Sequence, residues 1–496
     1  MSNIYVMIPK KLGTIEPNIY GVFAEHIGGV IYDGIYVGEN SNVPNIRGFR
    51  TEIIEKVKKA GIPLIRWPGG CFAETYNWRD GIGPKAERPT RVNWWTKWDG
   101  RYETNEVGTD EFMDFCNLCE ADPYFAANIT STTPMDIREW MDYCNSPAGT
   151  TTLAKLREKN GHKEPYNIKI WGVGNETWGG GGRMTPEMYA HEYRKYVELM
   201  DNMEIGGRDT KTYQFVGSGA NGGNTEWTRK FLETIGEKNN RMTGYSFHYY
   251  CGRAGDPVAF TTEEWYEQLA KAARMQYMID LHWGTVVSYK MEPYAKLAID
   301  EWGCWHPDGS GPSKGYNLFE QQSTMRDAVV SALTLNIFNN NCSKIMLTTV
   351  AQLVNNLHCL FLSGGENCIC TPTYHVFDMY KTHHGATAVD SVSDCGKTEN
   401  DLDVLSTSAS VKDGKLTLTL ANLSADKDID ADLNLVGGAL GKNAEIITLA
   451  CDDIHAHNTF EDPECVKPIS TTTADFNGKI TIPHGGIVTV IADCEA

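Results

Sequence analysis

The chain of 496 residues is poor in the features that mark nucleic-acid-binding, membrane and exported proteins. It has 45 Lys and Arg against 64 Asp and Glu, and the resulting formal charge of -19 repels phosphate backbones and anionic membrane surfaces. It contains no run of 18 or more apolar residues, and the lysines of "MSNIYVMIPKKLG" follow a short apolar patch, opposite to the order in a signal peptide. We therefore expect a cytoplasmic protein with a neutral partner, and neither nucleic acid nor membrane as a partner.

The sequence also lacks dense clusters of cysteine or histidine. Its 14 cysteines are scattered, and without an export signal they are expected to be reduced thiols. Cys116 and Cys119 have a metal-like spacing, but they lie in an amphipathic helical pattern with no second pair to complete a zinc site. The adjacent His383 and His384 fall near a predicted domain junction, and we interpret them as structural. The sequence thus predicts neither a metal nor a cofactor.

Four consecutive glycines, residues 179–182, do not form a recognisable phosphate-binding motif. They lack the Lys and Ser or Thr of a P-loop and do not match the spaced fingerprint of dinucleotide-binding folds. We interpret them as a mobile loop or a close approach of the backbone.

Short apolar runs of the strand type recur along the first three quarters of the chain, and most are separated by helical patterns. In one helical pattern Phe49, Ile53, Val57 and Ala60 share a face that ends at Gly61. Strands that alternate with helices imply a parallel sheet, and eight strands imply a closed (β/α)8 barrel of the TIM type. The eight runs are "YGVFAEH", "IPLIRW", "DPYFAANI", "NIKIWGVGNE", "YQFVGSGA", "TGYSFHYY", "KLAIDEW" and "SKIMLTTVAQ".

The pattern changes beyond about Gly385, where short segments alternate apolar and polar residues with turns between them. "KLTLTLANLS", "AEIITLA", "KITIPHGG" and "IVTVIAD" predict an all-β sandwich of the jelly-roll type. The opening "NIYVMIP" alternates in the same way and can add a strand to it. We therefore expect a catalytic barrel over residues 18–382 and an accessory β-sandwich domain formed by residues 1–17 and 383–496.

Polar residues stand at the ends of the eight predicted strands, and in such barrels the reactive groups lie at the C-terminal ends of the strands. We expect these residues to converge on one rim: Glu25 and His26, Arg66, Asn128, Asn175 and Glu176, Asn221, His248 and Tyr250, Glu301, and Gln352.

Two of these residues, Glu176 and Glu301, each follow a strongly apolar strand and lie beside an indole. Each glutamate alone could form a salt bridge at the rim, but a pair of carboxyl groups is what glycoside hydrolysis needs. Flat indole rings can cover the C–H face of a sugar, and the nearby tryptophans are Trp94, Trp95, Trp98, Trp178, Trp302 and Trp305.

Seven segments resemble glycoside hydrolase family fifty-one, the α-L-arabinofuranosidases, in both sequence and order. They are "YGVFAEHIGG", "IRWPGGCFAETYNWRDGIGP", "ETNEVGTDEF", "WGVGNETWG", "SFHYY", "DEWGCWH" and "AQLVNN", and the resemblance spans residues 18 to about 380 in order. The resemblance implies a retaining mechanism in which Glu176 is the general acid/base and Glu301 the nucleophile. It also implies a homo-oligomer, often a hexamer in that family.

The same resemblance assigns further residues by motif. Glu25, Asn175, Tyr250 and Gln352 match residues that hold the terminal arabinofuranose, Trp305 and one of Trp94 or Trp95 match aromatic residues around the sugar, and Arg66 and His248 match groups that orient the nucleophile. The chain departs from the family pattern in two places. Cys71 stands where Asn is frequent, so a hydrogen bond from that side chain is weaker or replaced by the backbone, and "EWGCW" replaces the more usual "EWNVW" on the leaving-group side.

Our main hypothesis is therefore a retaining, exo-acting α-L-arabinofuranosidase that acts on arabinan or arabinoxylan oligosaccharides. A β-glucanase or β-xylosidase that uses the same barrel and carboxylate pair is an alternative, and pocket depth would distinguish it, because a deep pocket admits only a chain end. An inactive carbohydrate-binding barrel is the alternative from another class, although both carboxylates are present. A third interpretation treats the β domain as an assembly surface.

Overall fold

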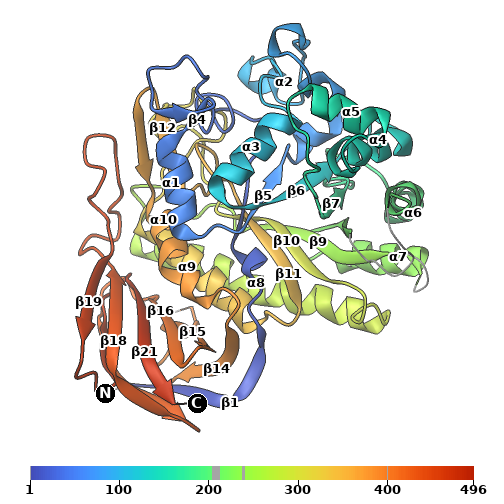
Figure 1. Cartoon of the computed structure of the whole chain (residues 1–496). Helices are drawn as coiled ribbons and strands as arrows, with labels where there is room; N and C mark the ends of the chain where they lie inside the picture. The colour runs from blue at the N-terminus through green and yellow to red at the C-terminus, as the bar shows by residue number, and fades with distance from the viewer. Residues whose placement is uncertain (1, 204–212, 237–240, 399, 496) are drawn as a thin grey trace.

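The computed structural model describes residues 2–203, 213–236, 241–398 and 400–495, and its centre is a closed barrel of eight parallel strands (Figure 1). The barrel closes because β2 pairs with both β5 and β11, and β9 pairs with both β8 and β10. All eight predicted apolar runs form barrel strands, so the predicted TIM-type barrel is confirmed. The strands are β2 (Gly21–Phe23), β5 (Leu64–Trp67), β6 (Asp122–Ala127), β7 (Ile170–Val173), β8 (Gln214–Asn221), β9 (Met242–Tyr250), β10 (Lys296–Gly303) and β11 (Ile345–Ala351).

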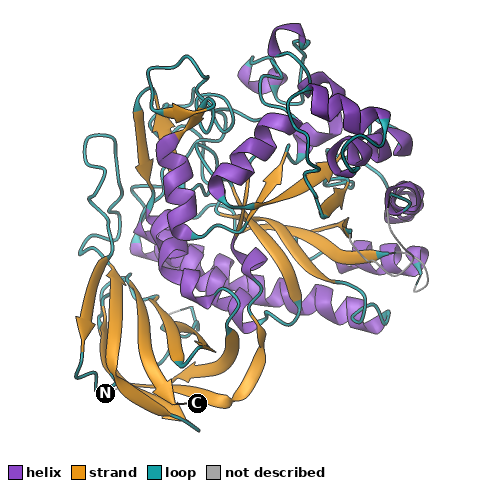
Figure 2. Cartoon of the chain, in the orientation of Figure 1, coloured by secondary structure: helices purple, strands orange, loops and turns teal. Residues whose placement is uncertain are grey.

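Helices surround the barrel strands (Figure 2). In α6 the Thr185 hydroxyl accepts a hydrogen bond from the amide of Met188, and Pro186 occupies the first turn, where a missing N–H costs nothing. The α-helices are α1 (Thr51–Ala60), α2 (Thr96–Asp99), α3 (Thr109–Cys119), α4 (Pro134–Asn145), α5 (Thr152–Lys159), α6 (Pro186–Asp201), α7 (Thr225–Ile235), α8 (Thr262–Ser288), α9 (Met325–Asn340) and α10 (Pro372–Tyr380). Short 3-10 turns are η1 (Pro17–Tyr20), η2 (Cys71–Thr75), η3 (Trp78–Gly81), η4 (Lys85–Glu87) and η5 (Lys381–His383).

The placement of Phe49 on a helix is wrong, because α1 begins only at Thr51. Phe49 instead belongs to the short strand β4 (Phe49–Arg50), which pairs with β3 (Asn45–Ile46). Its ring is still buried and lies 5.0 Å, centroid to centroid, from that of Phe115. Phe49 therefore matched the spacing of the apolar helix positions only because it is buried, although it lies before the helix.

A small apolar cluster fills the interior of the barrel toward the N-terminal ends of the strands. It contains Leu64, Tyr124, Ile170, Val216, Ala298 and Leu347. These residues come from six different strands and leave the barrel a packed core rather than a pore. The open face of the barrel is therefore the opposite one, at the C-terminal ends of the strands.

The C-terminal region forms a nine-stranded sheet that includes the N-terminal strand. β1 (Ser2–Thr14) pairs antiparallel with β14 and parallel with β17, so both ends of the chain lie in this sheet (Figure 1). The strand order is β19-β18-β21-β16-β15-β14-β1-β17-β20, and strands from both halves of that order share one apolar core. The predicted β domain and its N-terminal strand are confirmed. The other strands are β14 (Thr387–Ser393), β15 (Leu405–Lys412), β16 (Lys415–Asn422), β17 (Ile429–Val436), β18 (Ala439–Leu449), β19 (Ile469–Thr473), β20 (Lys479–Ile482) and β21 (Ile487–Glu495), while β12 (Phe361–Gly364) and β13 (Asn367–Cys370) form a separate hairpin.

Polar contacts join the barrel to this sheet. Asn339 of α9 donates through its side chain to the Ser408 hydroxyl of β15 at 3.0 Å. His383 is buried, with its ring nitrogens 2.7 Å from the Ser410 hydroxyl and 3.1 Å from that of Thr419. These contacts give His383 the structural role that its position in the sequence predicts.

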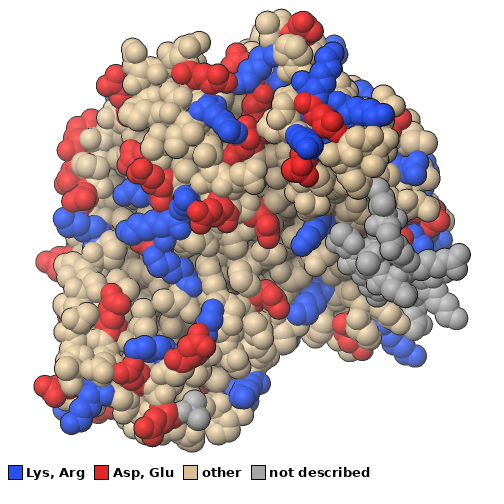
Figure 3. Space-filling model, in the orientation of Figure 1, with Lys and Arg blue, Asp and Glu red and all other residues tan. Residues whose placement is uncertain are grey.

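Within the described residues, none of the helices combines the length and the apolar character that crossing a membrane requires. On the face drawn in Figure 3, acidic and basic side chains are interspersed rather than gathered into a continuous basic stripe.

Candidate active site

Two carboxylates from distant parts of the chain meet at the C-terminal end of the barrel. Glu301 lies within β10, beside His248 of β9 in the strand register, and is buried. Glu176 follows β7 in a tight turn, and its carbonyl oxygen accepts hydrogen bonds from the amides of Gly179 and Gly181 at 2.7 and 3.1 Å. Gly181 has no room for a side chain, because a Cβ atom there would lie 1.9 Å from a backbone oxygen. The four glycines, residues 179–182, therefore let the backbone turn back and pass close to Glu176.

The backbone of Glu176 has a φ angle of +42°, in the left-handed region that residues other than glycine rarely adopt. Such conformations cost free energy and persist where the surrounding structure holds them, frequently at functional sites. Here the turn that follows the strand aims the carboxyl group across the barrel mouth toward His248.

His248 lies between the two glutamates. Its Nδ1 atom is 2.9 Å from Glu176 Oε1 and 3.3 Å from Glu301 Oε2, and its Nε2 atom is 3.2 Å from Asp300 Oδ1. One carboxylate oxygen of each glutamate and one nitrogen of His248 all lie within 4.8 Å of one another. Burial would lower the pKa of His248, but the charge of Glu301 and the hydrogen bonds to Asp300 and Glu176 outweigh burial and raise it to about 10. The ring is therefore a cation among three acidic side chains.

Both oxygens of Glu301 accept hydrogen bonds, which fixes the orientation of the carboxylate. Arg66 donates from Nη1 to Glu301 Oε1 at 2.9 Å, and the Tyr250 hydroxyl donates to Glu301 Oε2 at 2.9 Å. Burial would lower the pKa of Arg66, but the charges of Asp300 and Glu301 raise it above its usual value. Arg66 also donates from Nη2 to Asn175 Oδ1 at 2.6 Å. A permanent cation thus connects Glu301 to the amide of Asn175.

Glu25 is the centre of a second buried group beside Glu301. Its Oε1 accepts hydrogen bonds from the amides of Gly70 and Phe72 at 3.0 and 2.9 Å and from the Trp95 indole at 3.2 Å. Gln352 accepts from the Glu25 amide at 2.9 Å and donates to Glu25 Oε2 at 3.4 Å. Residues that follow β2, β5 and β11 therefore share one polar wall.

Glu25 changes its protonation state near neutral pH. Burial of the side chain and then the charge of Glu301 raise the pKa of Glu25 to about 7. Hydrogen bonds from the Phe72 amide and the Trp95 indole act in the opposite direction. Glu25 can therefore either donate to or accept from a ligand hydroxyl at this pH.

Gly70 brings the backbone close to Glu301 and Asn175, where only glycine fits. A Cβ atom at this position would lie 2.7 Å from Glu301 Oε1 and 3.2 Å from Asn175 Nδ2. Asn175 Nδ2 is itself buried without a hydrogen-bond partner. Because buried donors are normally satisfied, an unpaired amide beside a carboxylate marks a position where a ligand can accept a hydrogen bond.

Aromatic rings form one wall around this polar floor. The ring centroid of Trp305 lies 5.0 Å from that of Tyr250 and 5.0 Å from that of Phe319, and the Trp95 centroid lies 5.9 Å from that of Phe319. Trp305 keeps 39 % of its surface exposed. The structure therefore brings Trp95 and Trp305 together, and it adds Phe319, which sequence reasoning missed because its loop shows no apolar pattern.

Cys71 lies against the turn that carries Glu176. A Cβ atom at Gly180 would lie 2.6 Å from the Cys71 sulfur and 3.3 Å from the Trp94 ring. Burial and then the charge of Glu176 raise the pKa of the Cys71 thiol. The thiol is therefore neutral and narrows the site at its Glu176 side.

Glu74 is a buried residue at the site that the sequence analysis missed. Its Oε1 accepts from the amide of Asn175 at 2.8 Å, and its Oε2 accepts from the amides of Thr130 and Ile129 at 3.1 and 3.3 Å. Burial raises the pKa of Glu74 to about 7. This one side chain ties the loops that follow β5, β6 and β7, and the acidic residue inside "GGCFAET" was the available signal.

Asp300 is a further buried residue at the site that the sequence analysis missed. Its Oδ2 accepts from the Tyr124 hydroxyl at 2.7 Å, and it lies beside both His248 and Arg66. Burial would raise the pKa of Asp300, but the charge of Arg66 and the hydrogen bond from His248 hold it below its usual range. Its position directly before Glu301 in "IDEW" was the signal that could have identified it.

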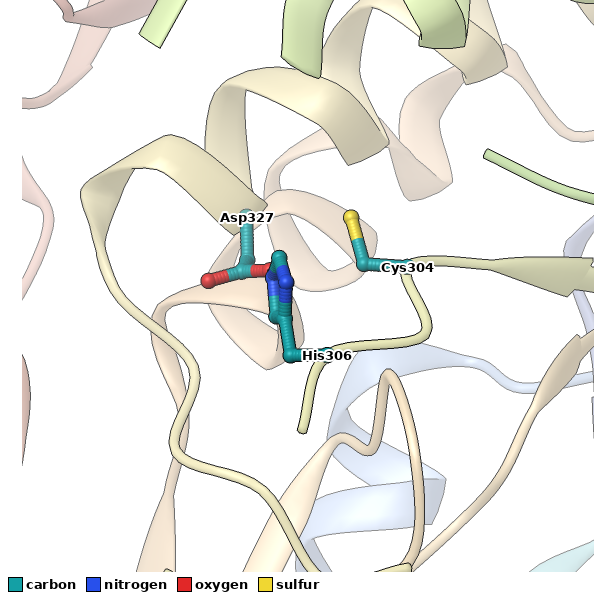
Figure 4. A group of neighbouring side chains, drawn as sticks. All are labelled: Cys304, His306 and Asp327. Carbon is teal, nitrogen blue, oxygen red and sulfur yellow. The ribbon is translucent and has the colours of Figure 1, made fainter. Parts of the chain in front are cut away.

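A separate group of metal-ligand type side chains lies beyond the end of β10 (Figure 4). Cys304, His306 and Asp327 are all buried. Asp327 caps α9 through the amide of Thr324 at 2.8 Å and lies 2.9 Å from His306 Nε2. These hydrogen bonds explain why Asp327 and His306 lie together, because Asp327 caps the helix and His306 is its hydrogen-bond partner.

Comparisons with known proteins agree with this architecture. Residues 56–250 match the family described as "Alpha-L-arabinofuranosidase 1 domain", and residues 300–484 match the family described as "Alpha-L-arabinofuranosidase C-terminal domain". An "Intracellular exo-alpha-L-arabinofuranosidase" of Bacteroides ovatus is 37% identical over 489 residues, which cover 96% of this chain and 92% of the relative.

Solved structures of arabinofuranosidases also resemble this chain over its whole length. A GH51 arabinofuranosidase from Xanthomonas axonopodis pv. citri superposes with a TM-score of 0.91 at 31% identity, covering 99% of this chain and 100% of the other. An α-L-arabinofuranosidase from Thermotoga maritima, in complex with arabinose, superposes with a TM-score of 0.86 at 28% identity, with the same coverage.

Proposed function

The chain belongs to the family 51 α-L-arabinofuranosidases of the glycoside hydrolases, and we propose that it removes terminal, non-reducing α-L-arabinofuranosyl units from arabinose-containing oligosaccharides. The relative from Bacteroides ovatus carries the name of an exo-acting enzyme, and its similarity over nearly the whole chain supports the same mode of action.

One observation carries the proposed mechanism: a carboxylate oxygen of Glu176 and one of Glu301 lie within 4.8 Å of each other. Retaining glycosidases place their two carboxyl groups about 5 to 5.5 Å apart, whereas inverting enzymes need about 6.5 to 9.5 Å to admit a water molecule between them. The spacing therefore supports a double displacement.

In the first step Glu301 attacks the anomeric carbon of the arabinofuranose. A bond forms between the carboxylate oxygen and that carbon, the bond to the leaving oxygen breaks, and Glu176 gives its proton to that oxygen. In the second step Glu176 takes a proton from water, the water oxygen attacks the same carbon, and Glu301 leaves as a carboxylate. Both glutamates end in their initial protonation states.

The remaining predicted residues have separate roles in this proposal. Arg66 and His248 orient the carboxylates and offset their charge, which is supported by their contacts with Glu301 and Glu176. The residues proposed to contact the sugar or the leaving group are Glu25, Cys71, Asn175, Tyr250, Gln352, Trp95 and Trp305.

Release of nitrophenol from 4-nitrophenyl α-L-arabinofuranoside tests the function. We expect turnover of this substrate and little turnover of the β-xyloside and the β-glucoside, which represent the β-xylosidase and β-glucanase alternatives. Proton NMR of the first product formed should show the α anomer, and the β anomer would contradict retention. Binding of arabino-oligosaccharides without any turnover would favour the inactive carbohydrate-binding alternative.

The proposal extends to the organisation of the chain. We assign catalysis to residues 18–382 and an accessory role to residues 1–17 and 383–496. A cytoplasmic location and a homo-oligomer such as a hexamer remain predictions, and light scattering coupled to size-exclusion chromatography measures the second.

A further inference from the structure

A cavity of about 490 Å³ lies outside the catalytic site described above, on the same end of the barrel. It is built from the loops that follow β2, β5 and β10, represented by Asp33, Tyr102 and Tyr316. Its volume is in the range of roughly 300 to 1,000 Å³ that is usual for small-ligand sites. We name it the tyrosine pocket.

The tyrosine pocket and the catalytic site share their loops. The three loops also carry Glu25, Trp95 and Trp305, which form part of the proposed sugar site. Arg101 joins them, because its guanidinium donates to the carbonyl oxygen of Gly28 and, at 2.9 Å, to Asn317 Oδ1. These hydrogen bonds hold the pocket in a fixed position relative to the loops that carry the proposed sugar site.

The rim of the pocket exposes two tyrosines. Tyr316 is 72% exposed and Tyr102 is 60% exposed. The Arg101 guanidinium lies 4.4 Å from the centre of the Tyr316 ring and so orients that ring while leaving most of its surface open. Exposed aromatic rings with a polar edge suit a ligand that has both apolar C–H faces and hydroxyl groups.

The charges of the pocket exclude an anionic ligand. Asp33, Asp99 and Glu106 contribute carboxylates to its lining, and the guanidinium of Arg101 is already engaged by backbone and side-chain oxygens. Buried in its lining, Glu103 is paired with His26, with 2.9 Å between Glu103 Oε2 and His26 Nδ1. Phosphates and acidic sugars would meet net negative charge, whereas a neutral polyhydroxylated ligand would find several hydrogen-bond acceptors.

We propose that the tyrosine pocket is a second carbohydrate-binding site, which holds a neutral pentose chain of a long substrate while the terminal arabinofuranose of that substrate occupies the catalytic site. This inference rests on the proposed function. It predicts that the pocket lowers the KM for long substrates and has no effect on a substrate with a single sugar unit.

The test compares substrates of different length in the full-length Tyr316→Ala and Tyr102→Ala variants. We expect KM for arabinan or arabinoxylan to rise roughly three- to tenfold, as loss of one aromatic contact implies, with unchanged kcat/KM for nitrophenyl arabinofuranoside. Tyr294→Ala is the matched control, because Tyr294 is 53% exposed and lies just before the N-terminal end of β10, at the other end of the barrel. A change limited to arabinan or to arabinoxylan identifies which pentose chain is bound.

Two results would overturn the inference. Unchanged KM for both polymers in the two variants would show that the pocket does not bind them, and an equal loss on the nitrophenyl substrate would show that the tyrosines act on the catalytic loops instead. Failure of the wild-type enzyme to release nitrophenol would refute the proposed function, which is a different outcome. Calorimetric titration of Glu301→Gln with intact oligosaccharides, with and without Tyr316→Ala, measures binding without turnover.

Discussion

The catalytic end of the barrel and the C-terminal sheet are buried in opposite ways. At the barrel end, Arg66, His248, Asp300 and Glu301 are all buried with their charges beside one another. The core of the sheet is a cluster of aliphatic residues, with Leu418 of β16 fully buried in it. Buried charges cost free energy unless they are paired, whereas buried aliphatic side chains stabilise the fold directly. The barrel end is therefore organised for chemistry, and the C-terminal sheet is organised for stability.

Two departures from regular structure belong to the catalytic region. The positive φ angle of Glu176 and the unpaired amide of Asn175 both lie at the barrel rim. Natural proteins depart from regular packing mainly at functional sites and compensate elsewhere. Substitutions at the rim should therefore affect catalysis more than stability, and substitutions in the sheet core should do the reverse.

Replacement of the nucleophile should give the largest effect on catalysis. Glu301→Gln keeps the shape of the side chain but removes the attacking carboxylate, so we expect turnover of nitrophenyl arabinofuranoside to fall by roughly 10⁴-fold or more. Steady-state kinetics with nitrophenol detection measures the loss, and the melting temperature serves as the control for folding. Activity near that of the wild type would show that Glu301 is not the nucleophile.

Removal of the proton donor should have a smaller effect that depends on the leaving group. For Glu176→Ala we expect about a 10²- to 10⁴-fold loss on arabino-oligosaccharides and a smaller loss on the nitrophenyl substrate, whose leaving group needs less protonation. Azide should restore part of the rate, because this anion attacks the anomeric carbon of the glycosyl-enzyme in place of water, releases Glu301 and needs no general base. Equal losses on both substrates, without azide rescue, would refute the role of Glu176.

Glu74 offers a finer test, because it acts through the backbone of Asn175 rather than on the sugar. Glu74→Gln replaces one acceptor oxygen by an amide group and should shift the loops that follow β6 and β7. Because small displacements of catalytic groups can cost up to about 100-fold in rate, we expect kcat to fall by roughly tenfold, with a smaller change in KM. An unchanged kcat would mean that Glu74 only stabilises the loops, which thermal unfolding would then reveal.

The sequence predicted the regular parts of both regions but not their tertiary contacts. Apolar runs are short but recur regularly in the barrel strands, so all eight were recognisable, and each key glutamate follows such a run. β15 was missed because it is rich in serine and threonine, and Ser406 and Ser408 form hydrogen bonds with α9 instead of apolar contacts. Phe319 and Glu74 gain their roles only from contacts between distant loops, which no local pattern records.

Glu25 should make stability depend on pH in a predictable direction. Its pKa is about 7 in the folded protein and near 4.5 when the chain is unfolded, so the folded state binds more protons between these values. Stability contributed by this group is therefore fully present below pH 4.5 and is lost as the pH rises toward 7, by at most about 1.4 kcal/mol per pH unit. Glu25→Gln should flatten this part of the pH profile of unfolding, measured by denaturant titration. A steeper profile in the variant would contradict the assignment.

Leu418→Ala should have the smallest effect on catalysis and so completes the comparison. The substitution leaves a cavity in the sheet core, and large-to-small changes of this type cost about 2 to 5 kcal/mol of stability. The catalytic groups belong to barrel strands and loops that do not contact this core residue directly, so kcat/KM per folded molecule should stay within about twofold of the wild type at a temperature below the transition. Thermal unfolding and nitrophenol release on the same preparation measure both quantities. If catalysis fell in proportion to stability, the sheet would be shaping the catalytic end of the barrel, and the separation of chemistry from stability would not hold.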